Sequence, residues 1–303
     1  MSGKAASLRK LLNAGDYFVA PGVFDLFSAR IADRMGFKAI YMTGYGTALS
    51  LLGQPDAGIA SYSDFVGRVE RLAERTASPL IADADTGFGG LINVRHTVRG
   101  YEKAGAAAIQ IEDQEFPKKC GHTPGKRVVS QEEMVARITV AVDSRQSDDF
   151  CIIARTDSRA VHGFADAMRR GEAYQTAGAD ILFIEAPETR EELAEIGRSF
   201  DVPVMANMNP GPTKTPELPA AELAAMGFAF SIYPGITMMS AAAAMQQALC
   251  YVRDNGSALG IDMPLSTLAD LNEITGFPEV WQFERTYASL IDELEARKSE
   301  RKG

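Results

Sequence analysis

The segment GAAAIQIED, residues 105–113, joins a glycine, a short apolar run and two acids. The apolar run alternates little with polar residues, which is typical of a buried strand in a parallel sheet. A glycine in front of such a run suits the end of a helix that turns into the strand. The same spacing, in which the strand ends seven residues after the glycine, recurs at Gly36, Gly105, Gly178 and Gly227.

Eight apolar runs alternate with amphipathic helical stretches, and we expect each run to be a parallel strand. They lie near residues 18–21, 39–43, 80–85, 107–112, 151–155, 181–185, 204–207 and 229–233. Evenly built βα units predict an α/β fold, the (β/α)8 TIM-type barrel, whose sites lie at the carboxyl ends of the strands. A doubly wound open sheet is the alternative, although no Gly-rich dinucleotide-binding segment follows the first run.

The chain of 303 residues suits one barrel with additions at its ends. We expect a catalytic barrel over residues 1–255 and a helical extension over 256–303. A helix predicted over 278–297 carries an apolar stripe for which a closed barrel has no obvious place. The stripe would pack on a partner subunit or across its own barrel.

The formal charge of −9 argues against a nucleic-acid or anionic-membrane partner, either of which needs a clustered basic face. No apolar stretch approaches 18 residues, and the first residues lack the apolar core of a signal peptide, so we expect a soluble, cytoplasmic protein. Three cysteines cannot form a disulfide scaffold. Cys151 and Cys250 lie among apolar neighbours, which predicts buried, inert thiols.

Asp83 and Asp85 are two residues apart on a predicted strand, so their carboxylates should point to one face and converge on a hard cation. Glu112, from the next strand, would complete the site. Oxygen ligands favour Mg2+ or Mn2+ over zinc, since the chain has no Cys/His set at zinc spacing. Mg2+ usually keeps several waters, so Asp85 would bind directly and the other two partly through water. Capping of the next helix or pairing with lysines is the alternative.

Residues 118–127 form a polar segment with four cations that could close as a lid over an anionic ligand. Lysines beside Cys120 would make its thiol a competent proton donor or nucleophile, although an incidental surface cysteine is the alternative. Arg155 ends an apolar run and could bind a substrate carboxylate through two hydrogen bonds. An internal ion pair with Asp157 or Glu185 is equally compatible with the spacing.

Six segments, in order, resemble the isocitrate lyase and phosphoenolpyruvate mutase superfamily. They are TGYG at 43–46, QPD at 54–56, DADTGFG at 83–89, IEDQ at 111–114, KKCGH at 118–122 and ARTD at 154–157. The cysteine-bearing segment is similar to that of the carbon–carbon lyase branch, which includes methylisocitrate lyases and 2,3-dimethylmalate lyases. The resemblance implies a barrel with a C-terminal helix swapped between subunits, and a homotetramer built as a dimer of dimers.

The resemblance also implies roles for residues of this chain. It implies catalytic roles for Cys120, Lys118, His122 and Arg155, substrate contacts from Thr43, Gly44, Tyr45, Asp56, Gly121, Arg155, Glu185 and Asn207, and a Mg2+ site at Asp83, Asp85 and Glu112. The implied reaction is retro-aldol cleavage of a 2-hydroxy-2-alkyl dicarboxylate to pyruvate and a carboxylate, with Cys120 protonating the carbanion that leaves. The residues do not identify the base.

Two departures from the family bear on the substrate. Thr123 stands where methylisocitrate lyases typically carry a cation, which favours a diacid over a triacid. The loop after Asn207 also differs from the dimethylmalate-lyase pattern. The alternatives are an oxaloacetate decarboxylase, a phosphonopyruvate or phosphoenolpyruvate mutase-type enzyme, and a non-catalytic barrel that binds a dicarboxylate.

Overall fold

The computed structural model describes residues 2–121 and 123–300, and the chain divides into two compact units. We call residues 1–247 the barrel unit and residues 248–303 the C-terminal unit.

Eight parallel strands close the barrel in chain order, and β8 pairs with β1. They are β1 Phe18–Val23, β2 Ile40–Met42, β3 Leu80–Asp83, β4 Ala108–Glu112, β5 Cys151–Thr156, β6 Ile181–Ile184, β7 Val204–Asn207 and β8 Phe230–Tyr233. The predicted barrel is therefore confirmed, and the open sheet is excluded. Each predicted strand is found, with ends shifted by at most two residues.

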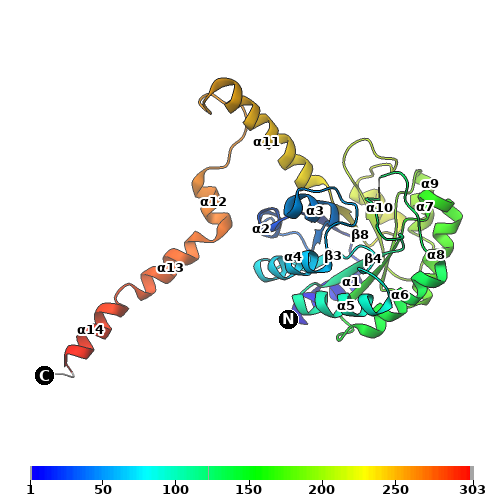
Figure 1. Ribbon diagram of the computed structural model, residues 1–303, viewed down its shortest axis with the longest axis horizontal. Coiled ribbons are helices and arrows are strands. Elements are labelled where there is room, and N and C mark those ends of the chain that lie inside the picture. The colour runs from blue at the N-terminus through cyan, green and yellow to red at the C-terminus, as the bar shows by residue number, and fades with distance from the viewer. Residues whose placement is uncertain (1, 122, 301–303) are drawn as a thin grey trace. The chain divides into compact units, whose positions relative to one another are not determined.

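Helices surround the strands (Figure 1). They are α2 Leu26–Arg34, α3 Gly44–Leu52, α4 Tyr62–Arg75, α5 Leu91–Ala104, α6 Gln131–Ser144, α7 Arg159–His162, α8 Phe164–Thr176, α9 Arg190–Ile196, α10 Ala220–Met226 and the first part of α11, Ile236–Asn255. The four glycines that precede β2, β4, β6 and β8 all have left-handed backbone, with φ from 78° to 103°. Glycine adopts this conformation without the steric cost that a Cβ atom brings, as the repeat predicted.

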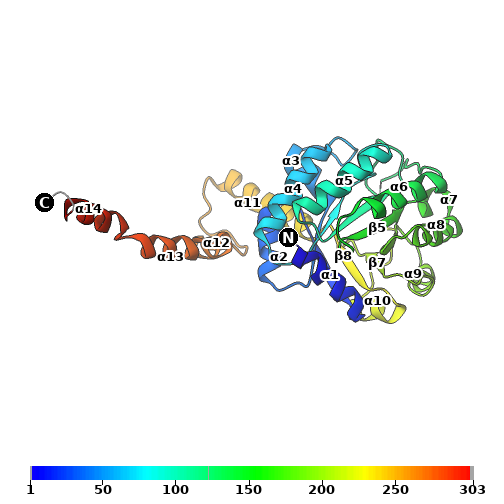
Figure 2. The ribbon, with the colours of Figure 1, turned by 90° about the horizontal axis from the view of Figure 1, so that it is seen from below.

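An additional helix, α1 (Ser2–Ala14), covers the amino-terminal end of the barrel and is dark blue in Figure 2. Leu8 and Leu12 are buried in one cluster with Phe18 and Phe230, whose rings stack 4.8 Å apart. A second apolar cluster fills the space between the strands and the outer helices. Burial of each large apolar side chain contributes about 2 kcal/mol. Apolar side chains thus close the amino-terminal end of the barrel. The polar residues that line the cavity lie at the other end, where the strands have their carboxyl ends.

The C-terminal unit contains α12 (Leu268–Thr275), α13 (Phe277–Tyr287) and α14 (Leu290–Glu300). The prediction of one helix over 278–297 is therefore wrong, because two helices, α13 and α14, cover this range. The Ser289 hydroxyl donates a hydrogen bond to Glu293 Oε1 (2.7 Å), a local contact that favours a new helix start. Among the described residues of this unit no apolar side chain is buried. Cys250 is exposed, so the prediction that it is buried was wrong, whereas Cys151 is buried as predicted.

Over residues 2–121 and 123–300, none of the helices combines the length and the apolar character that crossing a bilayer requires. The cytoplasmic location stays a prediction.

Candidate active site

A cavity of about 380 Å3 lies at the carboxyl ends of the strands. Eleven predicted site residues line it: Thr43, Tyr45, Asp56, Asp83, Glu112, Lys118, Cys120, Gly121, Arg155, Glu185 and Asn207. Gly44 and Asp85 lie directly behind this lining, in contact with Asp83 and Lys118 respectively. His122 lies outside the described residues. The structure thus brings together all the described residues to which the resemblance assigned roles.

Asp83 and Asp85 approach each other by a different route from the one predicted. Asp83 is the last residue of β3, whereas Asp85 lies beyond the strand in left-handed backbone with φ 48°. The two side chains nevertheless meet at Gly44, where a Cβ atom would lie 2.5 Å from Asp83 Oδ2 and 3.4 Å from Asp85 Oδ1. Gly44 N–H donates to Asp83 Oδ2 (3.2 Å) and Asp85 N–H donates to Asp83 Oδ1 (3.0 Å). Glycine at position 44 is required by this close approach.

Lys118 supplies the positive charge next to these acids. Its ammonium lies 2.6 Å from Asp56 Oδ1 and 2.7 Å from Asp85 Oδ1, and its side chain is only 3% exposed. Burial by itself lowers the pKa of Lys118, but the surrounding carboxylates, Asp85 first, raise it well above its usual value. Burial raises the pKa of Asp85 to about 7 even though Lys118 opposes this. Lys118 is thus held in its charged form between two carboxylates.

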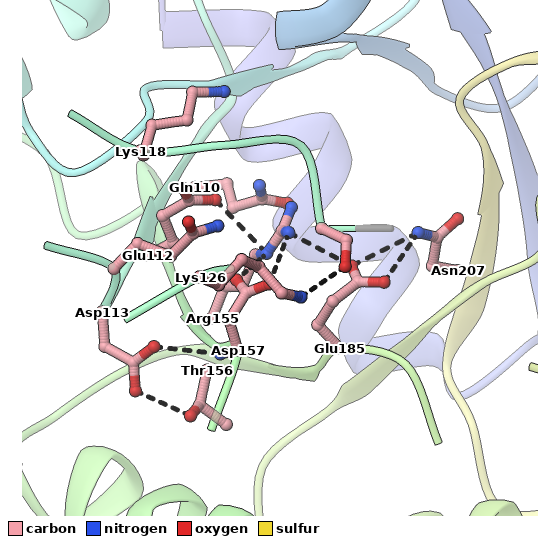
Figure 3. A network of polar contacts seen from close by, with 12 residues as sticks. Gln110, Glu112, Asp113, Lys118, Lys126, Arg155, Thr156, Asp157, Glu185 and Asn207 are labelled. Carbon is pink, nitrogen blue, oxygen red and sulfur yellow. Dashed lines mark hydrogen bonds and ion pairs between the residues drawn. The ribbon is translucent and has the colours of Figure 1, made fainter. Parts of the chain in front are cut away.

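Arg155, at the end of β5, makes both of the internal ion pairs that the spacing allowed (Figure 3). Its guanidinium donates to Asp157 Oδ2 (2.8 Å) and Oδ1 (3.2 Å) and lies 3.4 Å from Glu185 Oε2. The Asn207 amide in turn donates to Glu185 at 3.3 Å. Although burial opposes it, the cations Arg155 and Lys126 lower the pKa of Asp157 to about 2. Arg155 lies on the cavity wall and is therefore oriented by protein carboxylates.

A buried network that the sequence did not single out supports Arg155 from behind. Asp113 accepts hydrogen bonds from the Thr156 hydroxyl (2.7 Å) and from Asp157 N–H (2.9 Å). The Arg170 guanidinium (3.1 Å) and the Tyr174 hydroxyl (2.8 Å), both on α8, also donate to Asp113. The network joins the ends of β4 and β5 to α8, in the ring of helices around the strands. The sequence signal was Asp113 in the IEDQ segment, but its partners are distant in sequence.

Residues 115–121 and 123–127, which we call the thiol loop, contribute Lys118, Lys119, Cys120, Gly121 and Thr123 to the cavity wall. A Cβ atom on Gly121 would overlap Arg155 Nη2 and lie 3.0 Å from Glu185 Cδ. The loop therefore packs directly on Arg155 and Glu185. Its role as a lid stays a prediction. Cys120 is half-buried.

The buried acids of the cavity are of a chemical type that could hold a divalent cation. Glu112 Oε1 is buried and has no hydrogen-bond partner within the described residues, and burial raises the pKa of Glu112 well above its usual value. A buried carboxyl oxygen without a partner is costly unless a cation or water meets it. In the described part of the chain no three acid, imidazole or thiol side chains are spaced to share one ion directly. Asp83, Asp85 and Glu112 therefore do not form a preformed direct ligand cluster, although carboxylate oxygens are of the type that Mg2+ binds.

Sequence reasoning also missed the apolar wall of the cavity, which comes from Phe183, Ile232, Met238 and Met239. The ring of Phe183 lies 5.0 Å from the Arg155 guanidinium carbon. Nothing local distinguishes these side chains from ordinary core residues. Their role depends on closure of the barrel, which brings β6, β8 and α11 to the same end.

Comparison with known proteins places this geometry in a family. Residues 8–253 match the family model described as phosphoenolpyruvate phosphomutase. The chain is 45% identical over 285 residues to a 2,3-dimethylmalate lyase of Eubacterium barkeri, covering 94% of this chain and 98% of that one. It is 39% identical over 290 residues to a 2-methylisocitrate lyase of Aeropyrum pernix, covering 96% and 93%.

Solved structures agree with these relatives. Oxaloacetate acetylhydrolase in complex with the inhibitor 3,3-difluorooxalacetate matches with a TM-score of 0.89 at 36% identity, covering 94% of this chain and 97% of that one. Phosphonopyruvate hydrolase in complex with oxalate and Mg2+ matches with a TM-score of 0.84 at 32% identity, covering 94% and 99%. The resemblance read from six sequence segments is therefore confirmed, and the chain belongs to the phosphoenolpyruvate phosphomutase family, within the PEP mutase/isocitrate lyase superfamily.

Proposed function

We propose that the protein is a magnesium-dependent carbon–carbon lyase that cleaves a 2-hydroxy-2-alkyl dicarboxylate of the 2,3-dimethylmalate class to pyruvate and a carboxylate. The observation that carries the proposal is the shared cavity. The thiol loop, Arg155 with its partner Glu185, and the buried acids all line it. The similarity to a 2,3-dimethylmalate lyase over 94% of the chain supports it.

The residues divide the work of a retro-aldol cleavage. The 2-hydroxyl loses its proton to a basic group of the site, and its oxygen becomes the carbonyl of pyruvate as the bond from C2 to C3 breaks. The bond electrons pass to C3 of the leaving half, which then takes a proton from the Cys120 thiol. The amino-terminal end of α3, at Thr43–Tyr45, suits the carboxylate of the 2-oxo acid half. Arg155 suits the other carboxylate.

Magnesium supplies positive charge that stabilises negative oxygen when it is bound. Among the described lining residues, four carboxylates, on Asp56, Asp83, Glu112 and Glu185, outnumber three cations, on Lys118, Lys119 and Arg155. A further cation would offset the negative charge that a dianionic substrate adds to these carboxylates. We place the ion at Asp85, with Asp83 and Glu112 reached partly through water. Mn2+ suits the same ligands.

The cavity lining favours a small alkyl-bearing diacid. Met238, Met239 and Ile232 offer an apolar wall to the methyl groups of such a substrate. Thr123 lines the cavity and carries no charge for a third carboxylate, which a methylisocitrate-type substrate would bring. A third carboxylate without a cationic partner in the cavity would be buried unpaired, and a substrate that brings one would bind poorly.

We also propose that the protein acts as a homotetramer in which the C-terminal helices pack on a second copy of the chain. The exposed side chains of Phe277, Trp281, Phe283 and Leu294 support this, since an apolar surface in a helical extension needs a partner.

The substrate proposal predicts release of pyruvate from 2,3-dimethylmalate when magnesium is present. The measurement incubates the protein with 2,3-dimethylmalate, 2-methylmalate and 2-methylisocitrate, and follows pyruvate with lactate dehydrogenase. We expect the highest kcat/KM for the alkylated diacids. Turnover of oxaloacetate or phosphonopyruvate alone would replace the proposal by the decarboxylase or mutase-type alternative. Magnesium-dependent binding of oxalate with no turnover of any acid would favour the non-catalytic barrel.

A further inference from the structure

The base of the thiol loop is fixed to the barrel by backbone pairing. Gln114 and Val128 form an antiparallel bridge, and Val129 N–H donates to Asp113 O (2.9 Å). The Gln114 side chain makes two further hydrogen bonds with the backbone of Lys119, at 2.8 and 3.0 Å. These contacts hold the first part of the loop, before the tip at Cys120 and Gly121.

The tip is held by a lysine from the far end of the same loop. Lys126 Nζ donates to Gly121 O and to Asp157 Oδ1, the latter at 2.7 Å. The Lys126 side chain is only 4% exposed, although its neighbour Arg127 is 74% exposed and pairs with Glu115 on the surface. An ammonium is buried this deeply only where charged or polar partners compensate its lost hydration. Lys126 thus belongs to the buried polar network behind the cavity, and Arg127 does not.

Asp157 connects Lys126 to the catalytic side of the cavity. The same carboxylate accepts both hydrogen bonds from Arg155, so Lys126 and Arg155 share one acceptor (Figure 3). Gly121, whose carbonyl Lys126 holds, packs against Arg155 Nη2 without room for a Cβ atom. The Lys126 ammonium therefore contacts both the loop tip, at Gly121, and the carboxylate that orients Arg155.

We propose that Lys126 is a positioning residue that latches the thiol loop over the cavity and couples its closure, through Asp157, to the orientation of Arg155. This inference rests on the proposed lyase function for its catalytic consequence, but the latch itself does not depend on which acid is cleaved. In the open loop Lys126 loses Gly121 O, and Cys120 moves away from the leaving group. In the closed loop the proton donor and the carboxylate-binding cation are placed together.

The test compares Lys126→Met with Arg127→Met, each of which removes one loop cation and one trypsin site. Limited trypsin digestion in the presence of magnesium and oxalate, read by mass spectrometry, gives the rate of cleavage after Lys119. Steady-state kinetics on 2,3-dimethylmalate give kcat and KM separately. Lys126→Arg keeps the charge and supplies several N–H donors.

We expect Lys126→Met to be cleaved after Lys119 at least tenfold faster than the wild type and to lose about 30-fold in kcat, with KM changed less than threefold. Arg127→Met should stay within twofold on both readouts, and Lys126→Arg should recover most of the loss. Cleavage and kcat of Lys126→Met within threefold of the wild type would overturn the latch. Faster cleavage throughout the barrel with a lowered melting temperature would also overturn it, since Lys126 would then only hold the fold. If the wild type turns over no diacid, the digestion still decides the latch while the lyase proposal fails by itself.

Discussion

Replacing Cys120 by serine is expected to lower the turnover number for 2,3-dimethylmalate about 10³-fold and to leave oxalate binding within a few-fold of the wild type. Positioned general acids contribute roughly 10²–10⁴-fold to a rate, and a serine hydroxyl is a much weaker acid than a thiol. A loss of this size corresponds to about 4 kcal/mol in the activation free energy. Oxalate resembles the 2-oxo acid half and needs no proton, so its binding should persist. Steady-state kinetics and calorimetric titration with oxalate measure the two effects.

The matched control is Cys250→Ser, which makes the same atomic change at an exposed position of α11. We expect it to keep turnover within twofold of the wild type. Retention of more than a tenth of wild-type turnover by Cys120→Ser would show that the thiol is not the proton donor. Loss of both oxalate binding and turnover would show that Cys120 maintains the structure of the thiol loop.

Replacing Asp85 by asparagine is expected to lower turnover by about 10³-fold or more, because the proposed magnesium ligand loses its charge. Asparagine is the informative choice, since Asp85 has φ 48° and asparagine tolerates left-handed backbone better than alanine does. Lys118 keeps Asp56 as its partner at 2.6 Å, so its buried charge is not stranded. Calorimetric titration with Mn2+ and turnover at increasing Mg2+ concentration measure the effect.

Glu74→Gln removes the same charge at an exposed position and should leave both metal binding and turnover unchanged. Chelation of metal from the wild type with EDTA should abolish turnover, and added Mg2+ should restore it. Turnover by Asp85→Asn within tenfold of the wild type, or full activity in EDTA, would contradict the magnesium site.

The barrel could be predicted from the sequence because its signal is repeated. Each buried strand needs an apolar run, and the turn into alternate strands needs a left-handed residue, which glycine supplies at positions such as 105 and 227. The amino-terminal helix α1 was not predicted. Its Leu8 and Leu12 stripe is short, and only the closed barrel gives it a surface to cover. The break at Ser289 was missed because one hydroxyl contact decides it.

The gathering of the acids and Cys120 around one cavity could also be predicted, since buried acids at strand ends are costly unless they are paired. The backbone that joins them could not. Asp85 reaches Asp83 through a left-handed turn and not through strand alternation, and a periodicity argument cannot describe that turn. Lys126 looked like one of four loop cations, and its burial follows from Asp157, 31 residues away. Cys250 has apolar neighbours in sequence that face solvent on α11.

Cleavage of 2,3-dimethylmalate in deuterium oxide, with the products analysed by mass spectrometry and NMR after a brief reaction, tests the central claim most directly. If the bond electrons pass to the leaving half and a positioned thiol meets them, propionate will carry one deuterium, in a single configuration, next to its carboxylate. The methyl group of pyruvate will carry none. Propionate labelled without stereochemical preference, or deuterium in the pyruvate methyl group, would contradict the account.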